Sequence, residues 1–377
     1  MKHSHLLKLL PLLSFLTCFF AIALLLSSQA VFAKAGQHSQ PGVSWSTVTN
    51  SDWTMFDFHH SRFNANEQTL SSANVSHLSL AWSIKPSTTA LGGPLTEMVV
   101  ANGIVYTISP NATSNDSLDA LNEQTGKFLW QRILPSRNGP VGGRYYLTVV
   151  NGLLYINDGS YALAYNAATG TKIWSRSIVP WYAMVVVNGV VYVQSGLGYP
   201  NGQSSVYALN AQTGTTLWNI VLQQDLHSAS PAVANGVVYV GAVDGTFLAL
   251  NASTGKTLWK ASLGTNNAIV TAPVVDNGAV YVEGDSVGLF AFNASTGKRL
   301  WFAPSDPYAG SPAVAYGKVY LTEGIGAIQA YNETTGKLLY RYNNTPYQGQ
   351  NYSSSVVANG MLFFNLAYGY TDALKLK

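Results

Sequence analysis

Ala249-Leu250-Asn251-Ala252-Ser253-Thr254-Gly255-Lys256-Thr257-Leu258-Trp259 is the stretch of sequence that decides the fold. Its frame, Asn-x-x-Thr-Gly-x-x-x-Trp, occurs six times, and the last copy ends in Tyr340 instead of tryptophan. The glycines of the six copies are 44, 44, 41, 42 and 39 residues apart; they are Gly126, Gly170, Gly214, Gly255, Gly297 and Gly336. A unit of about 40 residues that recurs in this way indicates the blades of a β-propeller.

A second phrase alternates with the first and places Asn-Gly, or a similar pair, between two apolar runs. It occurs seven times, with its glycine at Gly103, Gly152, Gly189, Gly236, Gly278, Gly317 and Gly360. Asn-Gly between such runs predicts a type I′ hairpin, because both central residues need positive φ. In one unit we expect strands at 230–234, 237–241, 247–250 and 257–261. The Asn-x-x-Thr-Gly stretch then forms the last turn, with an asparagine cap and a left-handed glycine.

The seven hairpins and six Asn-Thr-Gly phrases do not match in number, because the last unit ends after its third strand. We expect residues 78–84, which carry Trp82, to supply the missing fourth strand. The sequence therefore predicts an all-β fold: a seven-bladed propeller of four-stranded antiparallel blades, closed by an N-terminal strand. Such closure leaves no exposed sheet edge. Eight blades would make every unit shorter than the observed period.

The N-terminus predicts export. Residues 1–33 combine a basic start, an apolar run and a small-residue end, which is typical of a secretory signal. The apolar run at 9–26 leaves a membrane tether open as an alternative. We expect 34–77 to pack on the propeller and 78–377 to form it, in a monomer that is secreted or extracytoplasmic. The one cysteine, Cys18, lies in the signal, so the mature chain has no disulfide. The formal charge is +3 without any basic run, which excludes nucleic acid as a partner.

The complete phrase resembles the tryptophan-docking repeat of the quinoprotein (pyrroloquinoline quinone, PQQ) β-propellers, over about 300 residues. In that family the tryptophan of one blade stacks on the Thr-Gly peptide of a neighbouring blade. The resemblance implies this docking role for Trp82, Trp130, Trp174, Trp218, Trp259, Trp301 and Tyr340. The repeat occurs in dehydrogenases and also in a non-enzymatic outer-membrane barrel-assembly propeller, to which this chain is closer. Fold alone does not decide between the two functions.

The resemblance to the dehydrogenases would imply PQQ with Ca²⁺, an Asp base and often a vicinal disulfide. A hard cation needs several converging oxygen ligands. Asp158, Asp244, Asp285 and Glu323 each follow a second strand, and we expect them to form turns or face solvent. Glu283 is two residues from Asp285 and could share a cation with it, although solvation is the simpler interpretation. We therefore predict no catalytic residue, no metal site and no cofactor, with PQQ and Ca²⁺ as the alternative.

The connections between blades are where the repeats differ most. They contain the residues that we predict to bind a ligand: Arg144, Tyr145, Tyr146, Trp181, Tyr182, His227, Tyr308 and Tyr352. Loops on a rigid scaffold commonly carry binding residues, and rigid aromatics give contact area at low entropic cost. Packing at the channel mouth is the other interpretation of these side chains. The leading hypothesis is a binding or scaffold module for a protein, peptide or glycan. A quinone-dependent oxidoreductase and a component of envelope protein assembly are the alternatives.

Overall fold

The structure, a computed structural model, describes fifteen stretches of the chain. They are residues 81–82, 98–109, 116–134, 145–180, 182–196, 204–224, 226, 229–264, 271–284, 287–305, 309–323, 327–343, 356–358, 361–365 and 371–375. All of them belong to one compact unit, Thr47–Lys377; the other unit is Met1–Ser46. The predicted signal at 1–33, the tether at 9–26 and the segment 34–77 lie outside the described residues. No helix that could span a membrane occurs in the described stretches.

Every regular element in the described residues is a β-strand. The strands are β1 (Met98–Ala101), β2 (Ile104–Ser109), β3 (Ser117–Asn122), β4 (Phe128–Ile133), β5 (Tyr146–Val150), β6 (Leu153–Asn157), β7 (Ala162–Asn166), β8 (Lys172–Arg176), β9 (Val185–Val187), β10 (Val190–Gly196), β11 (Ser204–Asn210), β12 (Thr216–Leu222), β13 (Ala232–Ala234), β14 (Val237–Gly241), β15 (Thr246–Asn251), β16 (Thr257–Ser262), β17 (Val274–Asp276), β18 (Ala279–Gly284), β19 (Gly288–Asn293), β20 (Arg299–Ala303), β21 (Ala313–Ala315), β22 (Lys318–Thr322), β23 (Ala327–Asn332), β24 (Leu338–Asn343), β25 (Val356–Ala358), β26 (Met361–Asn365) and β27 (Thr371–Lys375).

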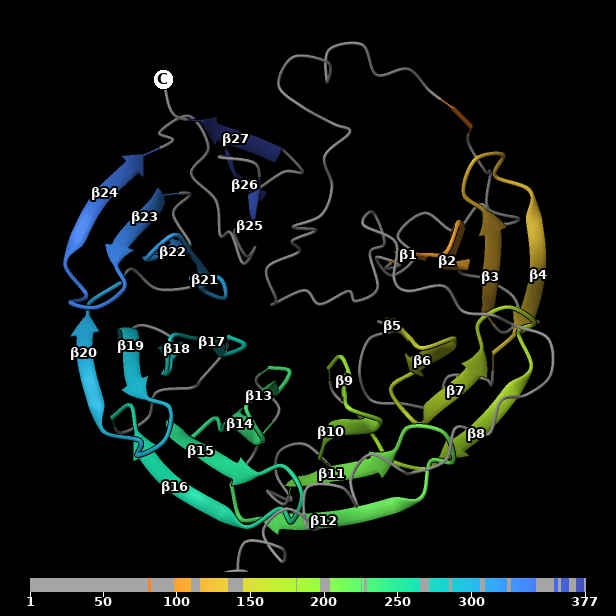
Figure 1. Cartoon of the computed structure of the whole chain (residues 1–377), viewed down its shortest axis with the longest axis horizontal. Coiled ribbons are helices and arrows are strands. Elements are labelled where there is room, and N and C mark those ends of the chain that lie inside the picture. Colours follow the sequence, from red (N-terminus) through yellow and green to blue (C-terminus); the bar gives the residue numbers. More distant parts are fainter. Residues whose placement is uncertain are drawn as a thin grey trace, which may run out of the picture. The chain divides into compact units, whose positions relative to one another are not determined.

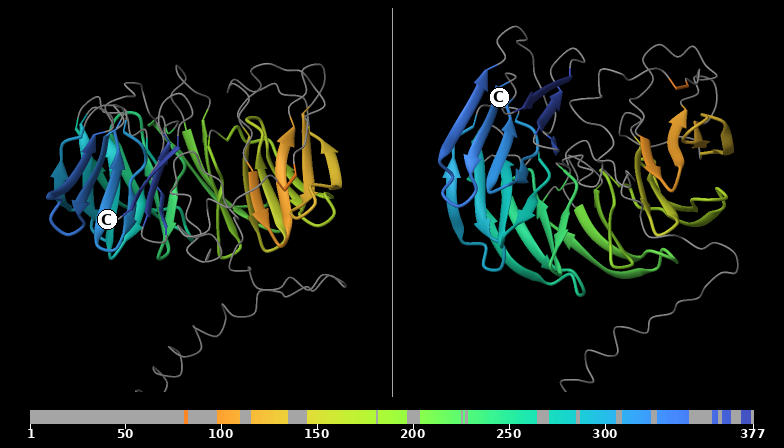
Figure 2. Two further views of the ribbon diagram at one scale, coloured as in Figure 1. Left: turned by 90° about the horizontal axis from the view of Figure 1, so that it is seen from above. Right: turned by 45° about the horizontal axis from the view of Figure 1, so that its top comes forward.

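Within each sheet, consecutive strands pair in chain order, and every pair is antiparallel. They form six four-stranded sheets and one three-stranded sheet, β25-β26-β27. The first strands of successive sheets contact one another from β1 through β5, β9, β13, β17 and β21 to β25. Within this unit the sheets therefore follow each other around a ring, with their first strands innermost (Figure 1). Seen from the side, the strands run between two ends of the ring (Figure 2). The predicted all-β propeller architecture is thus confirmed.

The two repeated phrases form turns at the same end of each sheet. In the hairpin between β13 and β14, Asn235 and Gly236 have φ of 51° and 76°, as a type I′ turn requires. Between β15 and β16, the Asn251 Oδ1 accepts hydrogen bonds from the Ser253 and Thr254 N–H groups, both at 3.0 Å. We call this end of the ring the turn end, and the opposite end, where the chain passes from sheet to sheet, the connection end.

The predicted strands of this unit agree with β13–β16 within two residues: two starts differ, and β15 and β16 each end one residue later than predicted, at Asn251 and Ser262. β13 begins at Ala232 rather than at residue 230, because Pro231 has no N–H to donate to the ladder. β15 begins one residue earlier than predicted, at Thr246. The Asp244 carboxylate accepts from the Thr246 N–H at 2.9 Å, and the Thr246 carbonyl accepts from Ala242 N at 2.8 Å. Thr246 is therefore already hydrogen-bonded in the sheet, and β15 begins with it.

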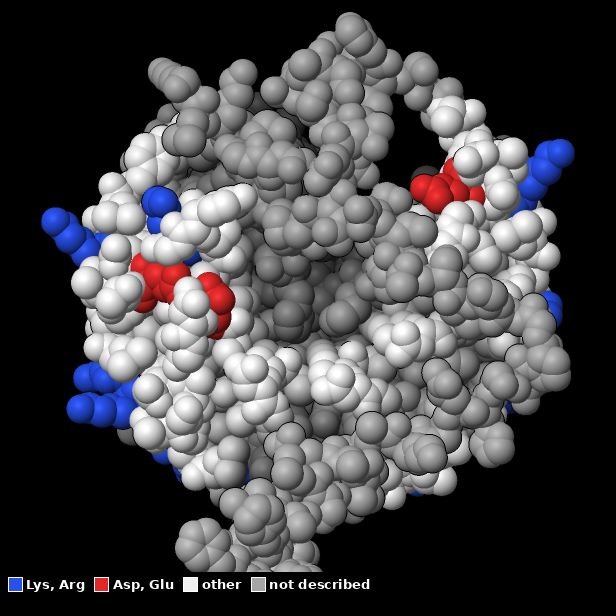
Figure 3. All heavy atoms as spheres, in the orientation of Figure 1, with Lys and Arg blue, Asp and Glu red and all other residues white. Residues whose placement is uncertain are grey.

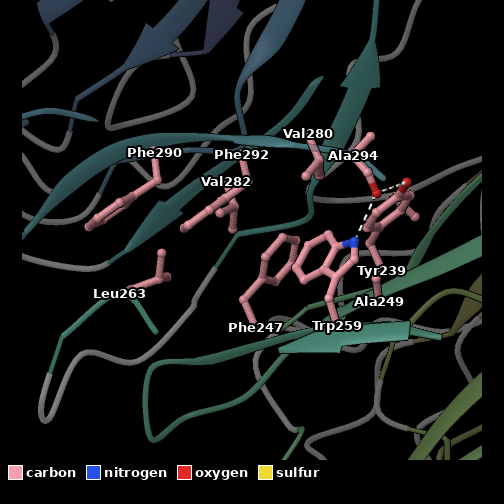
Figure 4. Packing of buried hydrophobic residues seen from close by; sticks show 11 residues of the cluster. Tyr239, Phe247, Ala249, Trp259, Leu263, Val280, Val282, Phe290, Phe292 and Ala294 are labelled. Atoms are coloured by element: carbon pink, nitrogen blue, oxygen red, sulfur yellow. Dashed lines mark hydrogen bonds between the residues drawn. The ribbon is translucent and has the colours of Figure 1, made fainter. Parts of the chain in front are cut away.

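The hydrophobic core lies between neighbouring sheets. One cluster joins Tyr239, Phe247 and Trp259 of the β13–β16 sheet to Phe290 and Phe292 of the β17–β20 sheet (Figure 4). Equivalent clusters fill the next seams on both sides. Because both faces of a sheet are covered in this way, its second and third strands are buried over most of their length. The fourth strands β4, β8, β16 and β20 are mostly exposed, and in each the repeat tryptophan is buried between exposed residues.

Candidate functional site

The tryptophan of the repeat binds the turn of the next sheet. Trp259 on β16 lies so close to Gly297 that a Cβ added to this glycine would meet Trp259 Cδ2 at 2.6 Å. The indole Nε1 donates to the Ala294 carbonyl at 2.9 Å, and the Tyr239 hydroxyl donates to the same oxygen at 3.2 Å (Figure 4). Gly297 also has φ of 68°. The Asn-Thr-Gly turn and the tryptophan thus recur together because they are the two halves of one contact.

The other tryptophans of the repeat make the same contact. The indole nitrogens of Trp130, Trp174, Trp218 and Trp301 donate to the carbonyls of Ala167, Ala211, Ala252 and Glu333 at 3.0, 2.9, 2.8 and 2.9 Å. Their rings cover Gly170, Gly214, Gly255 and Gly336. In each case the tryptophan belongs to a fourth strand and the glycine to the following sheet, which is the arrangement that the family resemblance implies.

The two ends of the series differ from its middle. Trp82 belongs to no described strand, yet its Nε1 donates to the Glu123 carbonyl at 2.8 Å and its ring covers Gly126 of the first sheet. Tyr340 on β24 is 54% exposed, whereas the tryptophans at the equivalent position of β4, β8, β16 and β20 are 7–8% exposed. The described part of the last sheet contains no Asn-Thr-Gly turn for Tyr340 to cover. The docking role implied for Tyr340 is therefore not seen in the described residues.

Three of the eight predicted ligand-binding residues fall in the described stretches, and they come together. Tyr145 and Tyr146 are only 1% and 4% exposed. The Tyr145 hydroxyl donates to Asp116 Oδ2 at 2.9 Å. The Tyr146 ring lies 6.2 Å from that of the partly buried Tyr182, between centroids. Tyr145 and Tyr146 therefore pack inside the ring, and Tyr182 is the accessible member of the group. The other five, Arg144, Trp181, His227, Tyr308 and Tyr352, lie outside the described residues.

A buried polar position holds Tyr182 in place. Asn157, at the end of β6, donates from Nδ2 to the Tyr182 carbonyl at 2.8 Å. Its Oδ1 accepts from the Gly159 N–H at 2.7 Å, so both halves of the amide are used. Pro180 forms a bridge with Ser195 of the next sheet. The connection that carries Tyr182 is thus fixed to the sheets on both sides of it.

Glu283 and Glu323 contradict the expectation that carboxylates after the second strands face solvent, because both are 0% exposed. Glu283 Oε1 accepts from the Ser305 hydroxyl at 3.1 Å. Glu323 Oε2 lies 3.0 Å from the Arg341 guanidinium, which neutralises it. Their burial comes from partners on other strands and connections, so turn chemistry read along the sequence could not reveal it. Asp285 lies outside the described residues.

Three further carboxylates, those of Asp158, Asp244 and Asp119, accept hydrogen bonds from groups on their own sheet. Asp158 accepts from the Ser160 and Tyr161 N–H groups, and Asp244 accepts from the Thr246 N–H, as predicted for turn residues. Burial raises the pKa of Asp158, although its backbone hydrogen bonds oppose the rise. In the first sheet, Asp119 accepts from the Gln131 amide at 2.8 Å. These carboxylates therefore serve the fold.

The carboxylates of the described residues do not converge on a shared metal position. Nowhere in the described stretches do three or more His, Cys, Asp or Glu side chains come together in an arrangement that could hold a metal ion. The buried carboxylates of Asp116, Asp119, Asp158, Glu283 and Glu323 each interact with a protein group. A Ca²⁺ ion would need several such oxygens to converge on one point.

Comparison with solved structures shows the same fold in proteins of different function. BamB from Moraxella catarrhalis superposes with a TM-score of 0.59 at 18% identity, over 73% of this chain and 80% of that one. A europium-containing methanol dehydrogenase gives 0.66 at 13% identity, over 86% and 84%. The quinohemoprotein alcohol dehydrogenase ADHIIG from Pseudomonas putida HK5 gives 0.58 at 14% identity, over 73% and 64%. At these identities the likeness concerns the fold alone. The search of curated proteins found no match.

A family profile described as "Outer membrane protein assembly factor BamB" matches three overlapping parts of the sequence, residues 64–198, 158–272 and 252–377. Together the matches extend from 64 to 377, and each contains at least two complete copies of the Asn-x-x-Thr-Gly-x-x-x-Trp/Tyr phrase. The resemblance inferred from Asn-x-x-Thr-Gly-x-x-x-Trp is thereby confirmed. The chain belongs to the PQQ-repeat β-propeller family described as outer membrane protein assembly factor BamB.

Proposed function

We propose that this chain is an exported, non-enzymatic binding or scaffold module that engages a protein or peptide partner in the cell envelope. One observation carries the proposal: the repeated aromatics and the buried carboxylates of the described residues make contacts that hold the propeller together. The side chains that differ from sheet to sheet are then the ones available for recognition. Export is supported by the signal pattern at 1–33, and the envelope setting by the description of the family.

We propose further that the ring has seven blades and is closed by residues 78–84. Trp82 supports this arrangement. The docking tryptophans on β4, β8, β12, β16 and β20 each lie on the fourth strand of the sheet before the one they cover. Trp82 covers Gly126 of the first sheet, so its segment corresponds to the fourth strand of the sheet before it, which is the three-stranded sheet β25-β26-β27.

The recognition surface of this proposal lies at the connection end. Tyr182 supports it, because this side chain remains partly accessible while Asn157 and Tyr146 fix its backbone and ring. A rigid aromatic loses little conformational entropy on binding. Trp181, next to it in the chain, and Arg144, His227, Tyr308 and Tyr352 on the other connections complete the proposed surface.

A photo-crosslinking experiment tests the site. A photoreactive phenylalanine derivative at position 181 of the full exported chain should crosslink to one protein species in the producing cells. The same derivative at Phe128, which is 54% exposed on the outer strand β4, is the matched control. The affinity of the purified partner should fall at least ~10-fold for the Trp181→Ala/Tyr182→Ala double variant. The Phe128→Ala/Phe302→Ala variant should keep it. Equal crosslinking at both positions, or equal affinities, would contradict the site.

The oxidoreductase alternative has its own test. Purified protein is titrated with PQQ and Ca²⁺, and dye reduction is followed with alcohols and sugars. The proposal predicts no stoichiometric quinone absorbance and no turnover. Stoichiometric binding together with turnover would overturn the non-enzymatic assignment.

A further inference from the structure

The turn end of the sixth sheet departs from the repeat at a strained position. The hairpins before β2, β6, β10, β14 and β18 all place asparagine at their first central position, with φ between 44° and 52°. The hairpin before β22 places Tyr316 there, with φ of 52°, and this side chain is 75% exposed. Asparagine tolerates this backbone region, whereas a bulky side chain rarely adopts it. Packing cannot offset the strain, because most of the ring faces water.

Three more departures from the repeat accompany Tyr316. Lys318 follows the hairpin glycine, where the first five sheets have the aliphatic residues Ile104, Leu153, Val190, Val237 and Ala279. Asp276 precedes the fifth hairpin, where the others have Ala101, Val150, Val187, Ala234 and Ala315. Glu333 follows the turn asparagine of the sixth sheet, as Glu123 does in the first, where the other four have Ala167, Ala211, Ala252 and Ala294. Because the other sheets form without Tyr316, Lys318 or Asp276 at these positions, the repeat itself does not require these three side chains. Glu333 also accepts from the buried Tyr281 hydroxyl at 3.2 Å.

Hydrogen bonds bring the four departures together. The Asn277 amide donates to Glu333 Oε1 and to Asp276 Oδ2, both at 3.2 Å. The Glu333 N–H donates to the Gly317 carbonyl of the Tyr316 hairpin at 3.1 Å, and the Lys318 ammonium donates to the Tyr316 carbonyl at 3.3 Å. Figure 3 shows acidic side chains gathered over β21 and β22, while most basic side chains lie on the outer rim. The fifth and sixth hairpins therefore share one patch.

We propose that this patch, formed by Tyr316, Asp276, Asn277 and Lys318, binds a neutral carbohydrate. A pyranose ring offers a C–H face that packs on an aromatic ring, and hydroxyl groups that both donate and accept hydrogen bonds. The patch has the matching parts: an exposed phenol, a carboxylate acceptor, an exposed amide and an ammonium donor. Glu333, which is 6% exposed, anchors the Asn277 amide from below.

The charge and size of the patch favour a neutral sugar over a macromolecular partner. Its charges have both signs, so neither a polyanion nor a polycation finds a uniform field. A protein interface of standard size buries about 800 Å² on each partner around an apolar core. Here a single aromatic side chain stands among polar groups. The patch lies at the turn end, so it is separate from the connection-end surface of the proposed function.

The test uses the full mature chain with maltohexaose, chitohexaose and mannohexaose as probes. Saturation-transfer NMR should detect binding of at least one hexasaccharide, and calorimetry should measure its affinity. Tyr316→Asn restores the residue of the other hairpins. This variant should bind at least ~10-fold more weakly, which corresponds to ~1.4 kcal/mol. Its melting temperature should be unchanged or higher, because asparagine relieves the left-handed strain.

Two control variants separate the patch from a general effect of tyrosine or of the other end of the ring. Asn235→Tyr creates the same exposed ring in the fourth sheet, where Val237 and Ala252 replace the lysine and the glutamate, and it should add no second binding site. Trp181→Ala/Tyr182→Ala should keep the saccharide affinity. The proposal fails if no hexasaccharide binds or if Tyr316→Asn binds as well as the wild type. Binding of hexalysine in place of the sugars, with loss in Tyr316→Asn, would overturn the carbohydrate assignment.

Discussion

Gly278 and Gly297 belong to the same sheet and both have positive φ, 76° and 68°, but their surroundings differ. A Cβ at Gly278 would meet no atom within 4 Å, whereas one at Gly297 would lie 2.6 Å from Trp259. At the scale of the residue, the hairpin glycine is therefore required only because the backbone there has a positive φ. The glycine of the Asn-Thr-Gly turn also makes room for the neighbouring indole.

This difference predicts unequal costs for the same substitution. Gly278→Ala should lower the free energy of unfolding by about 1 kcal/mol, which is the cost of a left-handed alanine. Gly297→Ala should lower it by about 3 kcal/mol, because the added methyl group also displaces Trp259. Chemical denaturation of both variants, with the indole fluorescence as the probe, measures the two values. Equal losses would mean that the contact between Trp259 and Gly297 adds nothing to stability.

At the scale of the element, the second strand of each four-stranded sheet carries a tyrosine three residues after the hairpin glycine, whereas β26 has Phe363 there. The hydroxyls of Tyr155, Tyr192 and Tyr239 donate to the turn carbonyls of Ala211, Ala252 and Ala294 at 3.2 Å. In each case this is the oxygen that the indole of the same sheet also reaches. One buried carbonyl thus joins the second and fourth strands of one sheet to the turn of the next.

Burial raises the pKa of these phenols above 10, including those of Tyr155, Tyr192 and Tyr239. Above about pH 10 the unfolded chain loses these protons while the folded chain keeps them, so the free energy of unfolding falls as the pH rises. Each such group contributes a slope of up to ~1.4 kcal/mol per pH unit. Urea denaturation between pH 8 and 11 should show the decline, and Tyr192→Phe should make it shallower.

The matched control for this slope is Trp218→Phe. It removes the other hydrogen bond to the Ala252 carbonyl, at 2.8 Å, but no titrating group. This variant should be less stable at every pH without any change in the alkaline slope. If Tyr192→Phe and Trp218→Phe changed the slope of the unfolding free energy against pH equally, the buried tyrosines of the second strands would not be the cause of the alkaline decline.

At the scale of the whole molecule, the repeated features could be predicted from the sequence and the single ones could not. Asn251, Gly255 and Trp259 belong to a phrase that occurs six times, so the sequence carries six copies of the residues that form one kind of contact. The burial of Glu283 depends on Ser305, and that of Glu323 on Arg341, which are particular to one sheet each. The described sheets show no second copy of either pair, so no repeat along the sequence marks them.

The candidate site shows the same division. The position of Tyr145 and Tyr146 on a connection predicts ligand binding, with packing at the channel mouth as the alternative, and in the structure both are buried beside Asp116 and Tyr182. The path of that connection follows from contacts between sheets, which local sequence patterns do not encode. Tyr316, by contrast, can be recognised from the sequence alone, because it is an aromatic residue at a position where the other hairpins have asparagine.

Closure of the ring by the Trp82 segment has a consequence that reaches both ends of the chain. If this segment is the fourth strand of the last sheet, Trp82→Ala removes the contact that ties that sheet to the first one. The free energy of unfolding should fall by about 3 kcal/mol, as for other large aromatic truncations. Backbone amide exchange should accelerate in β1–β4 and in β25–β27 together, since each set loses the same neighbour.

Trp259→Ala is the control within the ring, because Trp259 ties together two consecutive sheets. Its exchange should accelerate in β13–β20 and stay unchanged in β25–β27. Acceleration after Trp82→Ala in β1–β4 alone would mean that Trp82 covers Gly126 without belonging to the last sheet. The two ends of the propeller would then be stabilised separately. A shared response of two sets of strands, β1–β4 ending at Ile133 and β25–β27 beginning at Val356, requires the ring to be closed.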